Sequence, residues 1–137
     1  MIDITAPAAT FSDPHALAAA AAATVKDVEG VPDIPMFREN TAAFVHELPA
    51  AAISDVDGSS DHVRVQVLTN AGALSREQQL AVVERLTALV AEHAARPELA
   101  ERTWVLLTEA VAGGWGFWGH AHTNEELVAE ARARLSA

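Results

Sequence analysis

Residues 63–93, VRVQVLTNAGALSREQQLAVVERLTALVAEH, decide the fold of this chain. Their first five residues alternate Val with Arg and Gln, which predicts a strand with one buried face. Ser75 and Gln78 have the spacing of a capping box, which predicts that a helix begins after Ser75. Thr103–Glu109 is apolar enough to predict a buried strand after that helix. The apolar face of the helix is predicted at Leu80, Val83, Leu86, Leu89 and Val90.

The first half of the chain shows the same order of strand, helix and strand. Ser12 or Asp13 is predicted to cap its helix, and Gly30 is predicted to end it. The two prolines of stretch 31–40 predict a loop. The predicted elements are a strand over Ile2–Pro7, a helix to about Glu29 and a strand over Thr41–Leu48.

The two halves align with each other, since Ser12 matches Ser75 and Glu47 matches Glu109 at nearly the same offset. Because strand–helix–strand units favour parallel pairing, we predict an α/β (α+β) fold of two tandem β-α-β units. They form one four-stranded mixed sheet with both main helices on one face. The chain is predicted to be a single domain over 1–137, with repeated units of about 1–60 and 61–137. The uncovered sheet face predicts an oligomer.

A glycine–aromatic stretch and a tail helix follow the second unit. Residues 113–119, GGWGFWG, predict a hairpin, and Thr123 with Glu126 predicts another capping box. The tail helix is predicted to bury Leu127, Val128, Ala131 and Leu135.

Composition excludes several classes of function. The net charge of −10 argues against nucleic acid and membrane surfaces as partners, and the absence of cysteine removes disulfides and thiolate chemistry. His120 and His122 lack a third ligand nearby, so no metal and no cofactor are predicted. Asp55, Asp57 and Asp61 are interpreted as a solvated linker, and His62 is assigned no partner. The start of the chain has no basic leader, which predicts a cytoplasmic protein.

The second half resembles a unit of the tautomerase superfamily (4-oxalocrotonate tautomerase-like). The resemblance rests on the strand leading to a Ser75-capped helix, the Thr108-Glu109 step and the hairpin from Gly114 to Gly119. The first half resembles the same unit through 2–13 and 44–49. The resemblance covers nearly the whole chain and implies the fused two-unit form, a homotrimer and keto–enol isomerase chemistry.

Two features of that superfamily are missing. Relatives act through an amino-terminal proline, whereas this chain begins Met1-Ile2, and Met1 falls in the place of the proline. The arginines that relatives use to hold a carboxylate are replaced by Phe11, Leu74, Ala42 and Trp104. The Met1 α-amine, with an ordinary pKa near 8, is therefore the predicted catalytic group, as a weak base or as an imine-forming nucleophile. The predicted substrate-binding residues are Ile2, Trp104, Trp115 and Phe117.

Two functions remain open. In the first, the chain is a tautomerase-type isomerase with weak or no proline-type activity on a small carbonyl acid. In the second, it is a non-catalytic homotrimer that binds a small molecule or a protein. The aromatic residues line a ligand site in one interpretation, and pack the hairpin onto a neighbouring subunit in the other. A ferredoxin-like α/β sandwich is the alternative fold.

Overall fold

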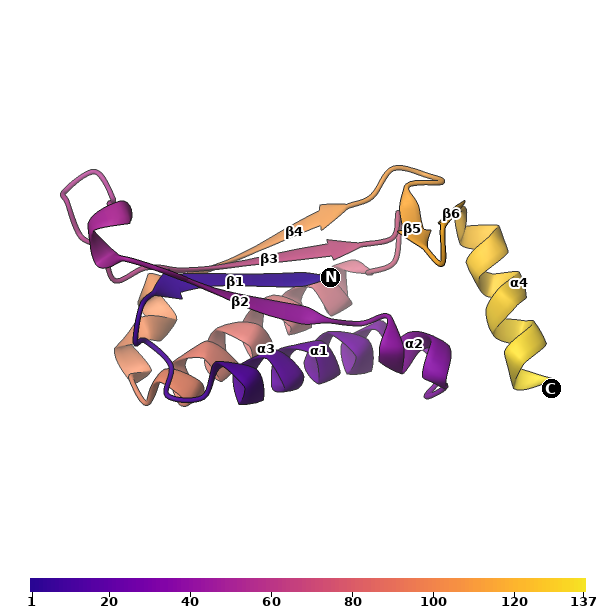
Figure 1. The fold of residues 1–137 in the computed structure, drawn as a ribbon, viewed down its shortest axis with the longest axis horizontal. Coiled ribbons are helices and arrows are strands. Elements are labelled where there is room, and N and C mark those ends of the chain that lie inside the picture. The colour runs from indigo at the N-terminus through magenta and orange to yellow at the C-terminus, as the bar shows by residue number, and fades with distance from the viewer.

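The computed structural model describes residues 1–137 and contains a four-stranded mixed sheet in the order β2-β1-β3-β4 (Figure 1). The strands are β1 (Ile2–Pro7), β2 (Ala43–Leu48), β3 (Val63–Thr69) and β4 (Thr103–Glu109). The pairs β1–β2 and β3–β4 are parallel, and the central pair β1–β3 is antiparallel. This arrangement confirms the predicted sheet of two β-α-β units.

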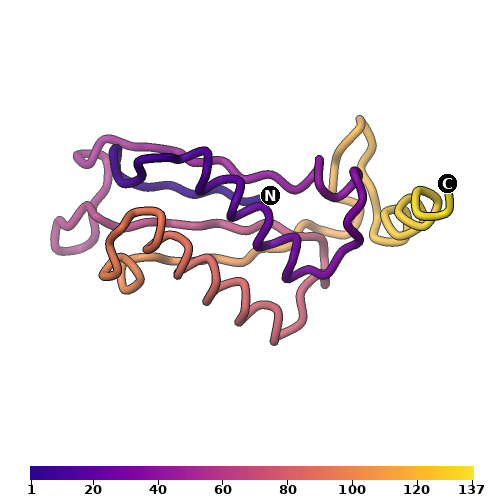
Figure 2. The backbone as a smooth tube through the Cα atoms, turned by 90° about the horizontal axis from the view of Figure 1, so that it is seen from below, coloured from indigo at the N-terminus to yellow at the C-terminus, as the bar shows by residue number.

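Both long helices, α1 (Pro14–Glu29) and α3 (Arg76–Ala94), cover one face of the sheet (Figures 1 and 2). Alternate residues of the two central strands point into this layer, because side chains alternate along a strand. The main apolar core lies there and includes Ile2, Ile4, Ala6, Val63, Val65, Val67, Leu17, Val25, Val82, Leu86 and Val90.

The helix starts follow the capping signals of the sequence. The Asp13 side chain accepts a hydrogen bond from the Ala16 amide at 3.0 Å, so Asp13 rather than Ser12 caps α1. Ser75 and Gln78 form the predicted capping box of α3. With Asp13 as the cap, Asp13 and Ser75 are separated by the same 62 positions as Glu47 and Glu109.

Stretch 31–40 is not the loop that its prolines suggested. It contains a short helix, α2 (Pro35–Glu39), with Pro35 in the first turn. A proline is favourable there because its missing N–H would have no partner within the helix. Met36 of α2 is buried, and this helix closes one end of the layer beneath the sheet.

The buried face of α3 also differs from the prediction. The buried residues are Val82, Leu86 and Val90, whereas Leu80 is more than half exposed and Val83 more than one third. The buried stripe follows the i, i+4, i+8 row of the helix. Leu80 and Val83 turn instead toward the sheet edge, where they form a shallow hollow with Val105 and Leu107 of β4.

The second face of the sheet is open. β4 is an edge strand and only one of its faces is covered by helices. Trp104 is 50% exposed and Leu106 is 46% exposed, so β4 is not the buried strand that its apolar run predicted. Phe44 of β2 and Leu68 of β3 are also exposed and belong to the strand positions that point away from the helices. On this open sheet face the four apolar side chains lie beside the polar side chains of Asp3, His46, Arg64 and Gln66.

The chain ends in a hairpin and a helix at the end of the sheet where β1 begins (Figure 1). They are β5 (Trp115–Phe117), β6 (His120–His122) and α4 (Asn124–Leu135). α4 buries Leu127 and Ala131, but Val128 and Leu135 are exposed, contrary to the prediction. Two 3-10 segments, η1 (Ala50–Ala52) and η2 (Pro97–Arg102), lie at the opposite end of the sheet.

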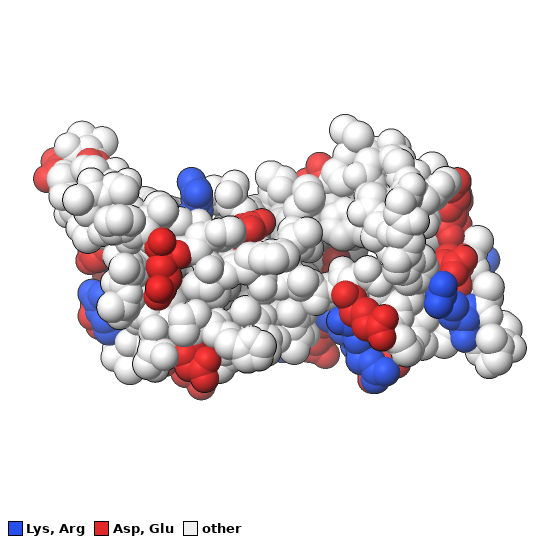
Figure 3. Space-filling model, viewed as in Figure 1, with Lys and Arg blue, Asp and Glu red and all other residues white.

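No helix combines the length and apolar composition needed to cross a lipid bilayer. On the side of the molecule seen in Figure 3, charged side chains form small separate groups with neutral surface between them. This side therefore presents no concentrated basic patch of the kind that binds phosphates.

Candidate functional site

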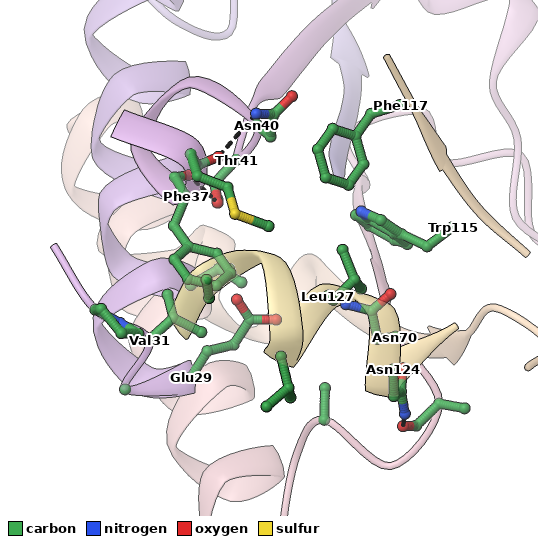
Figure 4. A pocket seen from close by; sticks show the side chains of 18 of the residues that line it. Glu29, Val31, Phe37, Asn40, Thr41, Asn70, Trp115, Phe117, Asn124 and Leu127 are labelled. Atoms are coloured by element: carbon green, nitrogen blue, oxygen red, sulfur yellow. Dashed lines mark hydrogen bonds between the residues drawn. The ribbon is translucent and has the colours of Figure 1, made fainter. Parts of the chain in front are cut away.

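A cleft of about 510 Å³ opens at the end of the sheet where β1 begins and β3 ends. The end of α1, α2, the turn after β3, the hairpin strand β5 and helix α4 form its walls (Figure 4). Its apolar wall residues include Met36, Phe37, Trp115, Phe117 and Leu127. The size and the apolar lining suit a small organic ligand.

Met1 is held at this cleft by the central pair of strands. Its amino group donates a hydrogen bond to the Leu68 carbonyl at 3.1 Å, and its own carbonyl accepts one from the Leu68 amide at 2.9 Å. Met1 lines the cleft, so the start of the chain is part of its wall. The sheet therefore positions the α-amine without help from a flexible loop.

Burial lowers the pKa of the Met1 amine below its usual value, because the charged form loses water. The negative charges of Glu29 and Asp3 act in the opposite direction and are the smaller effects. The amine therefore gives up its proton more readily than an ordinary chain terminus does. A neutral amine is both a base and a nucleophile.

Glu29 is the acidic group of the cleft. It is the last residue of α1, and its carboxyl group points into the cleft in Figure 4. Burial raises its pKa above the usual value, while the positive amino terminus has a smaller, opposite effect. The carboxyl end of a helix disfavours negative charge, which also favours the protonated acid. The cleft therefore holds a base and an acid whose pKa values have moved toward neutrality.

Three polar residues of the cleft stabilise its walls. The Asn40 amide donates to the Met36 carbonyl at 2.7 Å, and the Thr41 hydroxyl donates to the Phe37 carbonyl at 2.8 Å, so both brace α2. The Asn124 amide donates to the Ala71 carbonyl at 2.7 Å and joins the start of α4 to the turn after β3.

One cation other than the amino terminus lines the cleft. Arg132 lies on α4, and no ion pair engages its side chain. The superfamily resemblance placed the missing arginines at other positions, two of which, Phe11 and Leu74, are buried here. Arg132 is therefore a positive group that sequence reasoning did not find.

The cleft brings together three of the five residues predicted for the site: Met1, Trp115 and Phe117. Ile2 does not line it, because side chains alternate along β1 and that of Ile2 is fully buried in the core. Trp104 does not line it either. It is the second residue of β4, at the opposite end of the sheet, where its ring stacks on His62 with 4.6 Å between centroids.

His62 and the acidic linker form a second polar cluster, contrary to the prediction of a solvated linker and an isolated histidine. The Arg102 guanidinium donates to Asp61 at 2.7 Å and to Asp55 at 3.4 Å, and His62 lies 3.5 Å from Asp55. The hydrogen bond from Arg102 is the main cause of the lowered pKa of Asp61. The cluster fastens the linker to the start of β4, far from the cleft.

The two hairpin histidines have protein partners. His120 lies 3.2 Å from Glu126, and the His122 ring stacks on Phe117 with 4.3 Å between centroids. These contacts brace the hairpin strand that carries Trp115 and Phe117 into the cleft.

Besides Arg132, sequence reasoning missed Glu29 and α2. A glutamate at the last position of a helix opposes the helix dipole, and this was the available signal for Glu29. For α2 the signal was Pro35 followed by four residues that tolerate a helix.

No protein-family model and no curated protein matches the sequence. Solved structures do match the fold. Native fused 4-OT has a TM-score of 0.74 at 22% identity over 93% of this chain and 98% of its own. N1, a member of the cis-3-chloroacrylic acid dehalogenase family, has a TM-score of 0.73 at 19% identity over 98% and 97%.

A third structure, a wild-type fused 4-OT described as an asymmetric trimer, has a TM-score of 0.74 at 19% identity over 92% of this chain and 97% of its own. These neighbours are tautomerase-superfamily proteins, and identities this low establish similarity of fold. The chain therefore has the fold that its resemblance to the superfamily predicted.

Proposed function

We propose that this chain is a tautomerase-superfamily protein that interconverts the keto and enol forms of a small carbonyl acid at a low rate. The Met1 α-amine is the proton carrier, in place of an amino-terminal proline. The observation that carries the proposal is the position of this amine in an apolar cleft, where burial lowers its pKa. A base with a pKa near the working pH is best suited to move a proton.

In this reaction the neutral amine removes a proton from the carbon next to the carbonyl, and the carbonyl oxygen takes up negative charge. The resulting ammonium group returns the proton at the other atom to complete the isomerisation. Arg132 lines the same cleft and is the cation available to the carboxylate of the substrate. The aromatic walls cover the rest of a small ligand.

We also propose that the chain assembles as a homotrimer through the open sheet face. Trp104, Leu106, Phe44 and Leu68 expose large apolar side chains there, which neighbouring copies would cover. A fused 4-OT of the same fold is described as a trimer, which supports this assembly.

The second candidate function is ligand binding without catalysis. It is favoured by the primary amine, which replaces the cyclic amine of relatives, and by a cleft that is mainly apolar. In this case the cleft binds a small apolar molecule and releases it chemically unchanged.

The isomerase function and the binding function can be distinguished by measuring ketonisation of the phenylpyruvate enol through its ultraviolet absorbance between pH 6 and 9. Intact mass first establishes that Met1 is retained. We expect a rate above that of buffer, and loss of this rate when two residues are added before Met1. A rate equal to buffer at every pH would favour the binding function, and an active extended chain would exclude the Met1 amine as the proton carrier.

A further inference from the structure

The last turn of α1 ends at the cleft, and Glu29 is the only charged residue of this turn that lines it. Lys26 and Asp27 belong to the same turn but have partners outside the cleft. The Lys26 ammonium group lies 2.8 Å from Asp33, and the Asp27 carboxylate lies 2.6 Å from Arg85. The Glu29 carboxyl group instead points into the cleft (Figure 4).

No group of the protein neutralises the Glu29 carboxylate. Its side chain has no hydrogen-bond partner and no cation within the 4.0 Å that defines an ion pair, so Arg132, which also lines the cleft, does not pair with it. The positive charge that acts on the pKa of Glu29 is the Met1 amino group, whose own pKa is lowered by burial. The carboxyl end of α1 adds partial negative charge at the same place. This part of the cleft therefore lacks a positive charge.

We infer that the cleft is a binding site for a small aromatic molecule with a protonated amine, whose ammonium group pairs with Glu29. The aromatic part of the ligand follows from the walls, which include Phe37, Trp115 and Phe117. The ammonium group follows from the carboxylate and the helix end. An ammonium group carries the opposite charge and donates hydrogen bonds, so it supplies both of the things that the carboxylate lacks.

Burial makes this pairing favourable. A carboxylate that has lost part of its water and has no partner is costly, and the raised pKa of Glu29 reflects that cost. A ligand ammonium group removes the cost, and the two charges attract each other more strongly in an apolar cleft than in water. The net charge of −10 adds a long-range attraction for cations.

The inference goes beyond the proposed isomerase function and does not depend on it. It gives a ligand-binding role to Glu29, which takes no part in proton transfer by the Met1 amine. Arg132 is still available to a carboxylate, so the two kinds of ligand use different charged residues of the cleft. Amine binding and ketonisation can therefore be found or lost separately.

Binding of the amine is expected to strengthen as pH rises, because the ionised form of Glu29 is the one that pairs with an ammonium group. The Met1 amino group is the cation that acts on Glu29, and it also loses its proton as pH rises, which removes a competing positive charge. Arg132 keeps its charge over the same range, and so does a primary alkyl amine up to neutral pH. Binding at the acidic end of the range should release protons, since part of Glu29 is protonated in the free protein.

Calorimetric titration of the full-length protein with 2-phenylethylamine and with 2-phenylethanol, its uncharged counterpart of the same size, tests the inference between pH 5 and 8. We expect the amine to bind about tenfold or more tightly than the alcohol at pH 7, which is the usual value of a hydrogen bond to a charged group, and the preference to shrink toward pH 5. Glu29→Gln should remove the preference. Unchanged affinity of this variant for the alcohol would show that the cleft is still folded.

Glu39→Gln is the matched control, because it makes the same chemical change at the exposed last residue of α2, outside the cleft. It should keep the preference for the amine, and so should Glu29→Asp, which retains the carboxylate. Failure of both probes to bind, equal affinities for the amine and the alcohol, or a preference that persists in Glu29→Gln would overturn the inference. An equal loss of preference in Glu39→Gln and Glu29→Gln would also overturn it, because only the overall charge would then matter.

Discussion

Helix α4 forms one wall of the cleft, and replacing Leu127 by alanine should detach it. Leu127 is 8% exposed and packs with Ala131 and Met36 in a cluster separate from the main core. The other large apolar residues of α4, Val128 and Leu135, are exposed. A helix of 12 residues is marginal on its own, so the order of α4 depends on this small cluster.

The expected magnitude follows from the carbon atoms removed. Leu127→Ala deletes three carbons from a nearly fully buried side chain, at about 0.8 kcal/mol each, or about 2.4 kcal/mol in total. A loss of this size lowers the ratio of docked to detached α4 about 50-fold.

Hydrogen exchange measured by mass spectrometry tests this expectation. Amides of residues 124–135 should exchange up to about 50-fold faster in Leu127→Ala, while the main thermal transition, which reports the larger core, stays in place. Val128→Ala is the matched control on the same helix, since Val128 is 47% exposed, and it should leave exchange unchanged. Unchanged exchange in α4 together with a lower melting temperature would refute the reasoning, because it would place α4 within the cooperative core.

Three further outcomes are expected. Replacing Trp104 and Leu106 together by Glu puts charge on the open sheet face, and light scattering should report a smaller assembly while circular dichroism stays unchanged. Arg102→Ala removes the partner that lowers the pKa of Asp61. Because the pKa of Asp61 is lower in the folded state than its unfolded value of about 3.8, the ionised carboxylate stabilises the fold above pH 3.8, and this stabilisation is lost as pH falls through the folded pKa. The difference in melting temperature between Arg102→Ala and the unaltered protein should therefore be full at pH 7 and shrink below pH 3.8. Ser75→Ala removes the capping box of α3 and should lower the free energy of unfolding by about 1 kcal/mol in a urea titration.

The sheet and its covering helices could be predicted from the sequence, because the signals for these elements are local. Alternation in Val63, Val65 and Val67 and the cap at Ser75 determine where β3 and α3 lie, and the same signals recur in the first half. Local patterns could not reveal which neighbours each strand has. The apolar run of β4 therefore predicted burial, whereas its edge position exposes Trp104.

The cleft was less predictable, because its groups come from segments far apart in the chain. Met1 precedes β1, whereas Glu29 and Arg132 belong to α1 and α4, and no spacing in the sequence relates the three residues. His62 likewise acquires its partners Asp55, Arg102 and Trp104 only when the linker folds against the start of β4. Aromatic residues near one hairpin were easier to place, since the hairpin itself carries Trp115 and Phe117 to the same wall.

The position of the amine depends on strand register more than on the identity of the first side chain. The Met1 amino group donates a hydrogen bond to the Leu68 carbonyl, and the Met1 carbonyl accepts one from the Leu68 amide. Ile2 pairs with Val67 in the core. One added residue would carry the amine about 3.4 Å further along the strand direction, which is the rise per residue of an antiparallel strand. The buried Ile2 anchors this register, so the position of the amine depends on a core residue that does not line the cleft.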